Sequence, residues 1–118
     1  MREERGLLHG NQVISEPVDF LGSVSGDVSV VDGGKMYLRG AIYGNLHVEK
    51  GGRVHVFGSI SGKITLVRGA KVIISGVVGG DVTNDGGRLA IDQFARIFGK
   101  LRPLGGKTLV DPKAQVQQ

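Results

Sequence analysis

Apolar and polar residues alternate along most of the chain in short runs of about three to five positions. In Val28-Ser-Val30 and Val54-His-Val56, for example, one polar residue separates two aliphatic ones. A period of two places alternate side chains on opposite faces of an extended strand. Glycines interrupt the runs. The pattern therefore predicts short β-strands with one buried and one exposed face, joined at tight corners.

The whole pattern returns about every eighteen residues. Internal repetition of this kind indicates a stacked, repetitive architecture. The aliphatic positions keep the same register as the glycines over four successive repeats. The glycine series are Gly22, Gly40, Gly58 and Gly76, and Gly26, Gly44, Gly62 and Gly80. The aliphatic columns include Val24, Ile42, Ile60 and Val78, and Val28, Leu46, Ile64 and Val82.

A unit of eighteen residues cannot bury its apolar side alone, so successive units must stack. Glycine turns the chain at corners because it tolerates a positive φ. Three strands and three corners make one triangular coil, and coils stack at the strand spacing of about 4.8 Å. We predict an all-β, single-stranded, triangular parallel β-helix (a solenoid) of about five to six coils over residues 17–110. Residues 1–16 and 111–118 are expected to be flexible tails.

The closest alternative is a left-handed helix of hexapeptide repeats, because apolar residues also recur six apart from Val24 to Val48. Additional apolar columns at Val28 and Leu38 break that hexad. A sandwich would need strands that reverse direction, and an unbroken period has no reason to arise there. The hand of the solenoid does not follow from these spacings.

The composition restricts the core and the chemistry. Aromatic residues make up 5% of the 118 residues and hydrophobic residues 40%, so the core must be aliphatic. Cysteine is absent, which excludes disulfides and thiolate metal sites. No apolar run is long enough to span a membrane or to act as a signal peptide. We expect a cytoplasmic protein.

Four segments share one pattern: Gly22-Ser-Val-Ser-Gly26-Asp-Val, Gly40-Ala-Ile-Tyr-Gly44-Asn-Leu, Gly58-Ser-Ile-Ser-Gly62-Lys-Ile and Gly76-Val-Val-Gly-Gly80-Asp-Val. They resemble the repeat of the bactofilins, a family of bacterial cytoskeletal proteins. The resemblance covers roughly residues 18–110. It implies a right-handed triangular β-helix that polymerises end to end into nonpolar filaments, often at the membrane. The chain departs from the family in its short tails and in the coil of Asn84, which is one residue short.

The ends of a solenoid present unpaired strand edges, which recruit other strands unless they are covered. Most of the phenylalanines lie near the predicted end coils. We therefore expect a polymer interface in which end coils stack on copies of the chain, although terminal coils also serve simply as caps. Its predicted residues are Val18, Phe20 and Leu21 in the first coil and Phe94, Phe98, Leu101 and Leu104 in the last.

One outward column is basic and lies beside aromatic residues, in a chain of net charge +4. Such a stripe suits an anionic membrane surface or an acidic protein, and we do not expect nucleic acid as a partner. The competing interpretation is a solvated face neutralised by Asp32, Glu49 and Asp92. The predicted partner face comprises Lys35, Tyr37, Arg39, Arg53, His55, Phe57, Lys71, Arg88 and Lys107. A weaker membrane contact is predicted at Arg2, Arg5, Leu7 and Leu8, which otherwise belong to a disordered tail.

We find no pattern typical of catalysis. His47 and His55 alternate with inward residues and should point outward, without acidic neighbours that would complete a metal site. Asp27 and Asp81 hold equivalent positions but are separated by the coils of Asn45 and Lys63. The Gly-x-Val-x-Gly segments lack the helix that follows a dinucleotide-binding loop. No catalytic, cofactor-binding or metal-binding residue is predicted.

Three functions remain. The first is a cytoskeletal scaffold that self-assembles end to end into filaments through its terminal coils. The second is a non-enzymatic binding module, such as an immunity-type protein that blocks a partner through its basic and aromatic face. The third, an acyltransferase of the left-handed solenoid class, is disfavoured because neither a hexad signature nor a suitable catalytic histidine is present.

Overall fold

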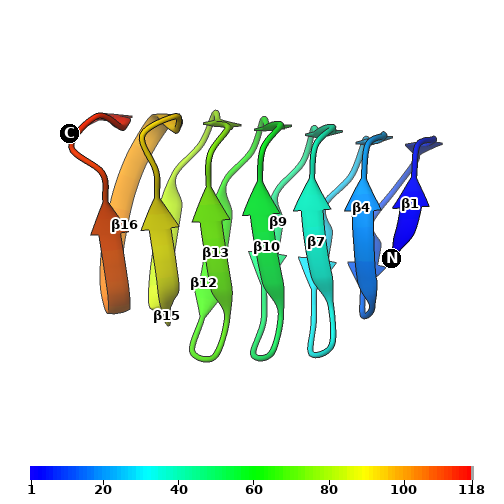
Figure 1. The fold of residues 1–118 in the computed structure, drawn as a ribbon, viewed down its shortest axis with the longest axis horizontal. Helices are drawn as coiled ribbons and strands as arrows, with labels where there is room; N and C mark the ends of the chain where they lie inside the picture. Colours follow the sequence, from blue (N-terminus) through cyan, green and yellow to red (C-terminus); the bar gives the residue numbers. More distant parts are fainter. Residues whose placement is uncertain (118) are drawn as a thin grey trace.

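The computed structural model describes residues 1–117 and confirms the predicted β-solenoid. Seventeen strands form about six turns, and every strand pairing is parallel. The coils are arranged in a row, with β1 and the N-terminus at one end and β16 at the other (Figure 1). The molecule measures 34 × 24 × 22 Å. The described residues include no helix, and therefore none that could cross a membrane.

The strands build three faces. The first face contains β1 (Arg2–Glu4), β4 (Pro17–Phe20), β7 (Lys35–Leu38), β10 (Arg53–Val56), β13 (Lys71–Ile74) and the C-terminal parts of β15 (Val82–Ile91) and β16 (Arg96–Val110). The second contains β2 (Leu7–Leu8), β5 (Ser23–Val24), β8 (Ala41–Ile42), β11 (Ser59–Ile60), β14 (Val77–Val78), the start of β16 and β17 (Gln115–Gln117). The third contains β3 (Gln12–Ile14), β6 (Val28–Val30), β9 (Leu46–Val48), β12 (Ile64–Val67), the start of β15 and the middle of β16.

Equivalent residues of successive repeats lie directly above one another. Val54 of β10, for instance, pairs with Met36 on one side and Val72 on the other, each eighteen residues away. The inward aliphatic residues from β4 to β14 are almost completely buried. The aliphatic columns thus form one continuous core, because the repeat keeps each side chain in phase with its neighbours above and below.

The first coil corrects our prediction of a flexible tail over residues 1–16. Strands β1, β2 and β3 pair with β4, β5 and β6 at an offset of sixteen residues. Arg2, Glu4 and Gln12 occupy inward register positions, opposite Val18, Phe20 and Val28. Because these inward positions are polar, a search for the repeat of apolar residues does not detect this coil. At the other end, β17 pairs with the start of β16, so the predicted tail from residue 111 also contains a strand.

The coil of Asn84 is one residue short, as the sequence indicates. Asn84 follows Leu66 in an inward column and is fully buried. Its Oδ1 accepts the Gly87 N–H at 2.8 Å, and its Nδ2 lies within 3.1 Å of the carbonyls of Gly87 and Lys107 and 3.0 Å from Thr108 Oγ1. The side chain therefore closes the shortened corner and ties it to the next coil.

Candidate functional site

A column of like charges runs along the outer side of the first face. We call it the basic ladder: Lys35, Arg53, Lys71, Arg88 and Lys107, which pair in register from β7 to β16. Each is the first outward residue of its strand segment; Lys35 is half-buried and the other four are exposed. Its formation confirms the predicted alignment of these residues.

The ladder has no acidic partner within the described part of the chain. The ion pairs of residues 1–117 join Arg2 to Glu16, Arg5 to Glu3, Arg39 to Asp19 and Arg102 to Asp81, and none includes a ladder residue. The three acids expected to neutralise the ladder, Asp32, Glu49 and Asp92, form no ion pair with it. Repulsion within the ladder is therefore not relieved by direct salt bridges.

Aromatic rings lie beside the ladder on coils three and four. We call Tyr37, His55 and Phe57 the ring cluster. The His55 and Phe57 rings stack with centroids 3.8 Å apart, and Tyr37 lies 6.4 Å from His55 at a tilt of 47°. Arg39, which forms a 2.8 Å ion pair with Asp19, covers the Phe57 ring at 4.8 Å. Lys35 Nζ lies 5.3 Å from the Tyr37 centroid, so ladder and cluster are in contact.

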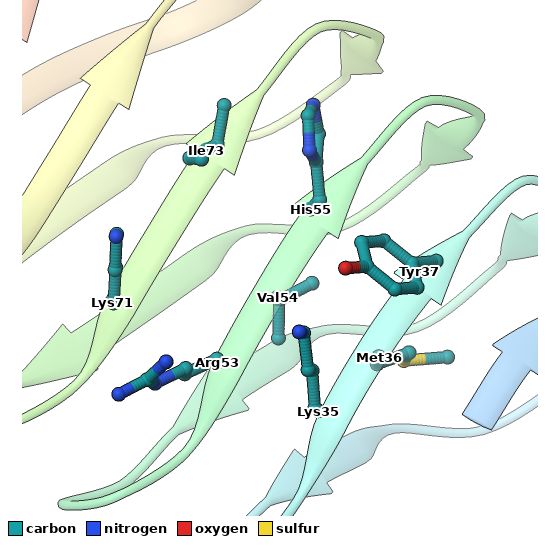
Figure 2. A pocket seen from close by; sticks show the side chains of 8 residues that line it. All are labelled: Lys35, Met36, Tyr37, Arg53, Val54, His55, Lys71 and Ile73. Carbon is teal, nitrogen blue, oxygen red and sulfur yellow. The ribbon is translucent and has the colours of Figure 1, made fainter. Parts of the chain in front are cut away.

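Shallow cavities lie between the two columns. The one in Figure 2 has a volume of about 190 Å³, with Lys35, Arg53 and Lys71 on one side and Tyr37, His55 and Ile73 on the other. A second cavity of about 160 Å³ shares Lys71 and Ile73 with it and extends toward Lys107 and Leu109. Together they form a groove that follows the ladder across successive coils.

A polar relay lies at the edge of this face. His55 Nε2 is 2.8 Å from Ser75 Oγ, which in turn donates a hydrogen bond to Asp92. Burial lowers the pKa of His55, and the nearby Asp92 carboxylate partly offsets this by raising it. The serine proton is directed to the carboxylate and not to the imidazole, so the order of contacts differs from that of a nucleophilic triad.

The sequence reasoning missed Ser75 as a member of this group. Ser75 lies twenty residues from His55, two positions beyond the repeat, and Asp92 follows where the next coil is shortened. Ser75 and Asp92 hold equivalent positions of successive coils, one residue beyond the paired Ile74 and Ile91. The contact of His55 with Ser75 is diagonal, and a search along the repeat columns does not find it.

The predicted polymer interface is wrong for Val18 and Phe20. The first coil covers them, and both are buried in the core. Phe94, Phe98 and Leu104 are 60–71% exposed; Phe98 and Leu104 lie in β16, and Phe94 precedes that strand. Leu101 is half-buried at the C-terminal end, next to the core, and Leu21 is half-buried at a corner.

The predicted membrane-contact residues lie within the first coil. Leu8 packs against the core, whereas Leu7 points outward and is exposed. Arg2 and Arg5 form exposed ion pairs with Glu16 and Glu3, respectively. The structure therefore brings only one of the two leucines to the surface.

The fold and its first face together define the class of protein: a parallel β-solenoid with a row of cations beside a shallow groove lined by aromatic rings. These cations form no ion pair within residues 1–117. No protein-family model, curated protein or solved structure matches the chain. Function must therefore be argued from the geometry of this chain.

Proposed function

We propose that the chain is a non-enzymatic structural protein that self-assembles end to end by stacking coil on coil. One observation carries this proposal: each coil pairs with the next through parallel strands in register on all three faces. The outermost strand segments therefore offer a second copy the same kind of edge that the internal coils use. Unpaired strand edges recruit further strands.

The C-terminal end is the better suited of the two for this contact. Leu101, Ala114 and Val116 are half-buried there against the core, and Val110 is 44% exposed. At the opposite end, Arg2, Glu4 and Gln12 occupy the inward register positions. Inward-pointing charged residues hinder strand addition. Assembly therefore begins between C-terminal ends, and growth into filaments additionally requires the first coil.

The test is the particle size of the purified chain over a concentration series, measured by light scattering and negative-stain microscopy. We expect the size to increase with concentration and Val116→Lys to abolish the increase. Val77→Lys is the matched control, since Val77 is 37% exposed and lies on β14, which already pairs with a strand on each side. Discrete monomers at every concentration, or equal effects of the two substitutions, would refute the proposal.

A second candidate function is that of a binding module that acts through its basic and aromatic face. The unpaired basic ladder and the groove beside it favour this function. Replacement of ladder residues should then abolish partner binding without changing the particle size, whereas Val116→Lys should do the reverse. The two functions are therefore separable by mutation.

A further inference from the structure

We propose that the groove along the first face binds single-stranded nucleic acid, with phosphates on the basic ladder and bases against the ring cluster. This inference rests on the second candidate function and names its partner by chemistry. From the sequence we did not expect nucleic acid as a partner. The structure adds that the cations and the rings line one cavity.

The basic ladder is regular along the first face. Its five cations are held at the strand spacing of about 4.8 Å, so the row spans about 19 Å. Like charges directly opposite one another on a sheet destabilise it, and no ion pair of the described residues relieves this row. A linear polyanion would neutralise the whole row at once, whereas a point anion would reach only two or three members.

The cavity in Figure 2 combines cations with aromatic rings. Three ladder cations line one side, and Tyr37, His55 and Ile73 line the other. Proteins that bind single strands combine a basic groove for the backbone with rings on which bases stack. Tyr37 and His55 of the ring cluster provide such a surface on coils three and four, and Ile73 and Leu109 continue it with apolar side chains.

Single-stranded nucleic acid fits both sides of the groove, unlike other polyanions. An acidic peptide would pair with the ladder but would supply no bases to stack on the rings. The same holds for inorganic polyphosphate. A flat lipid surface would contact the ladder without entering the recess between the ladder and the ring cluster. Only a strand with a charged backbone and planar bases occupies both sides of the groove.

The binding test uses a fluorescent 12-nucleotide oligo(dT) and the full chain, with fluorescence anisotropy read at 50 and 200 mM salt. If five phosphates are neutralised, the slope of log K against log salt is about −3.5, which corresponds to about a 100-fold loss of affinity between the two concentrations. Arg53→Gln with Lys71→Gln should reduce the slope to about −2. Lys63→Gln with Lys100→Gln removes the same charge outside the ladder and should leave the slope unchanged.

Base recognition is tested with an abasic oligonucleotide of equal length and charge. We expect it to bind at least about fivefold more weakly than oligo(dT), and Tyr37→Leu to remove this difference. Equal slopes for the ladder and control variants would overturn the proposal. Equal affinity for the abasic strand, or equally effective competition by polyglutamate or polyphosphate, would also overturn it, because the site would then recognise charge alone. Light scattering of the same variants reports on self-assembly separately.

Discussion

At the scale of single residues, side-chain oxygens at one corner hold successive coils together. Asn11, Asp27 and Asn45 each accept the backbone N–H of the equivalent residue one coil further on, at 2.8–3.0 Å. Asp81 does the same for Lys100 at 2.8 Å. Lys63 interrupts this corner column, because an ammonium group cannot accept a hydrogen bond.

Restoring the column should stabilise the protein. Lys63→Asn supplies an acceptor for the Asp81 N–H, and we expect the free energy of unfolding to rise by about 1 kcal/mol. Urea denaturation measures the change. Lys63→Ala removes the lysine without adding an acceptor, so it should give no such gain. If the two variants are equally stable, the side-chain acceptor contributes nothing at this corner.

The stability of the protein should depend on pH through the protonation of His55, a member of the ring cluster. Burial lowers its pKa in the folded state below the ordinary value of 6.5, so the unfolded state takes up a proton first as the pH falls. The contribution of His55 is therefore complete above pH 6.5 and is lost as the pH falls toward its folded pKa. His55→Phe should make stability less dependent on pH between 7.5 and 5.5.

Denaturation midpoints at several pH values test this expectation, with His47→Gln as a control on the third face. The denaturation midpoint should change less with pH in the His55 variant than in the native protein, and it should change as much in the His47 variant as in the native protein. A variant that keeps the slope of the native protein would show that the proton uptake occurs elsewhere.

At the scale of the strand and its corner, glycine sets how closely coils approach. A β-carbon at Gly58 would overlap the carbonyl oxygen of Gly40 directly below it, and the same holds at Gly40 over Gly22. The glycine column from Gly22 to Gly76 is therefore required by backbone contact between coils. At Gly105, by contrast, the nearest atom would lie 3.4 Å away, an ordinary contact distance.

Gly58→Ala should lower the free energy of unfolding by about 3 kcal/mol, because the backbone of two coils must separate locally. Gly105→Ala is the control and should cost less than about 1 kcal/mol. Thermal or urea denaturation of both variants makes the comparison. Equal stability of the two would mean that the coils move apart at little cost.

At the scale of the whole molecule, the first coil closes one end of the core. Without it, Val18 and Phe20 would form the exposed end layer. A chain that starts at Pro17 should lose about 3 kcal/mol or more of stability, since burial of each such side chain contributes about 1.5–3 kcal/mol. It should also aggregate, as exposed edges recruit other strands.

A chain with residues 1–16 in scrambled order keeps the length and charge of that segment, and it should behave like the shortened chain. Thermal unfolding and light scattering measure both effects. Unchanged melting of the shortened chain would show that residues 1–16 act as the flexible tail that the pattern alone suggested.

The amino-acid sequence by itself determined the solenoid, the period of the coils and the members of the basic ladder. It could do so because an eighteen-residue repeat fixes which side chains point inward and which positions stack. Even the shortened coil of Asn84 is visible as a break in that repeat. These features depend only on local alternation and on spacing.

Tertiary structure decided the rest. The first coil follows a sixteen-residue offset with polar inward residues, so only its pairing with β4–β6 reveals it. The contact of His55 with Ser75 crosses a corner, outside every repeat column. Whether the ladder cations find acidic partners depends on the reach of side chains across corners, which spacing along the chain does not specify.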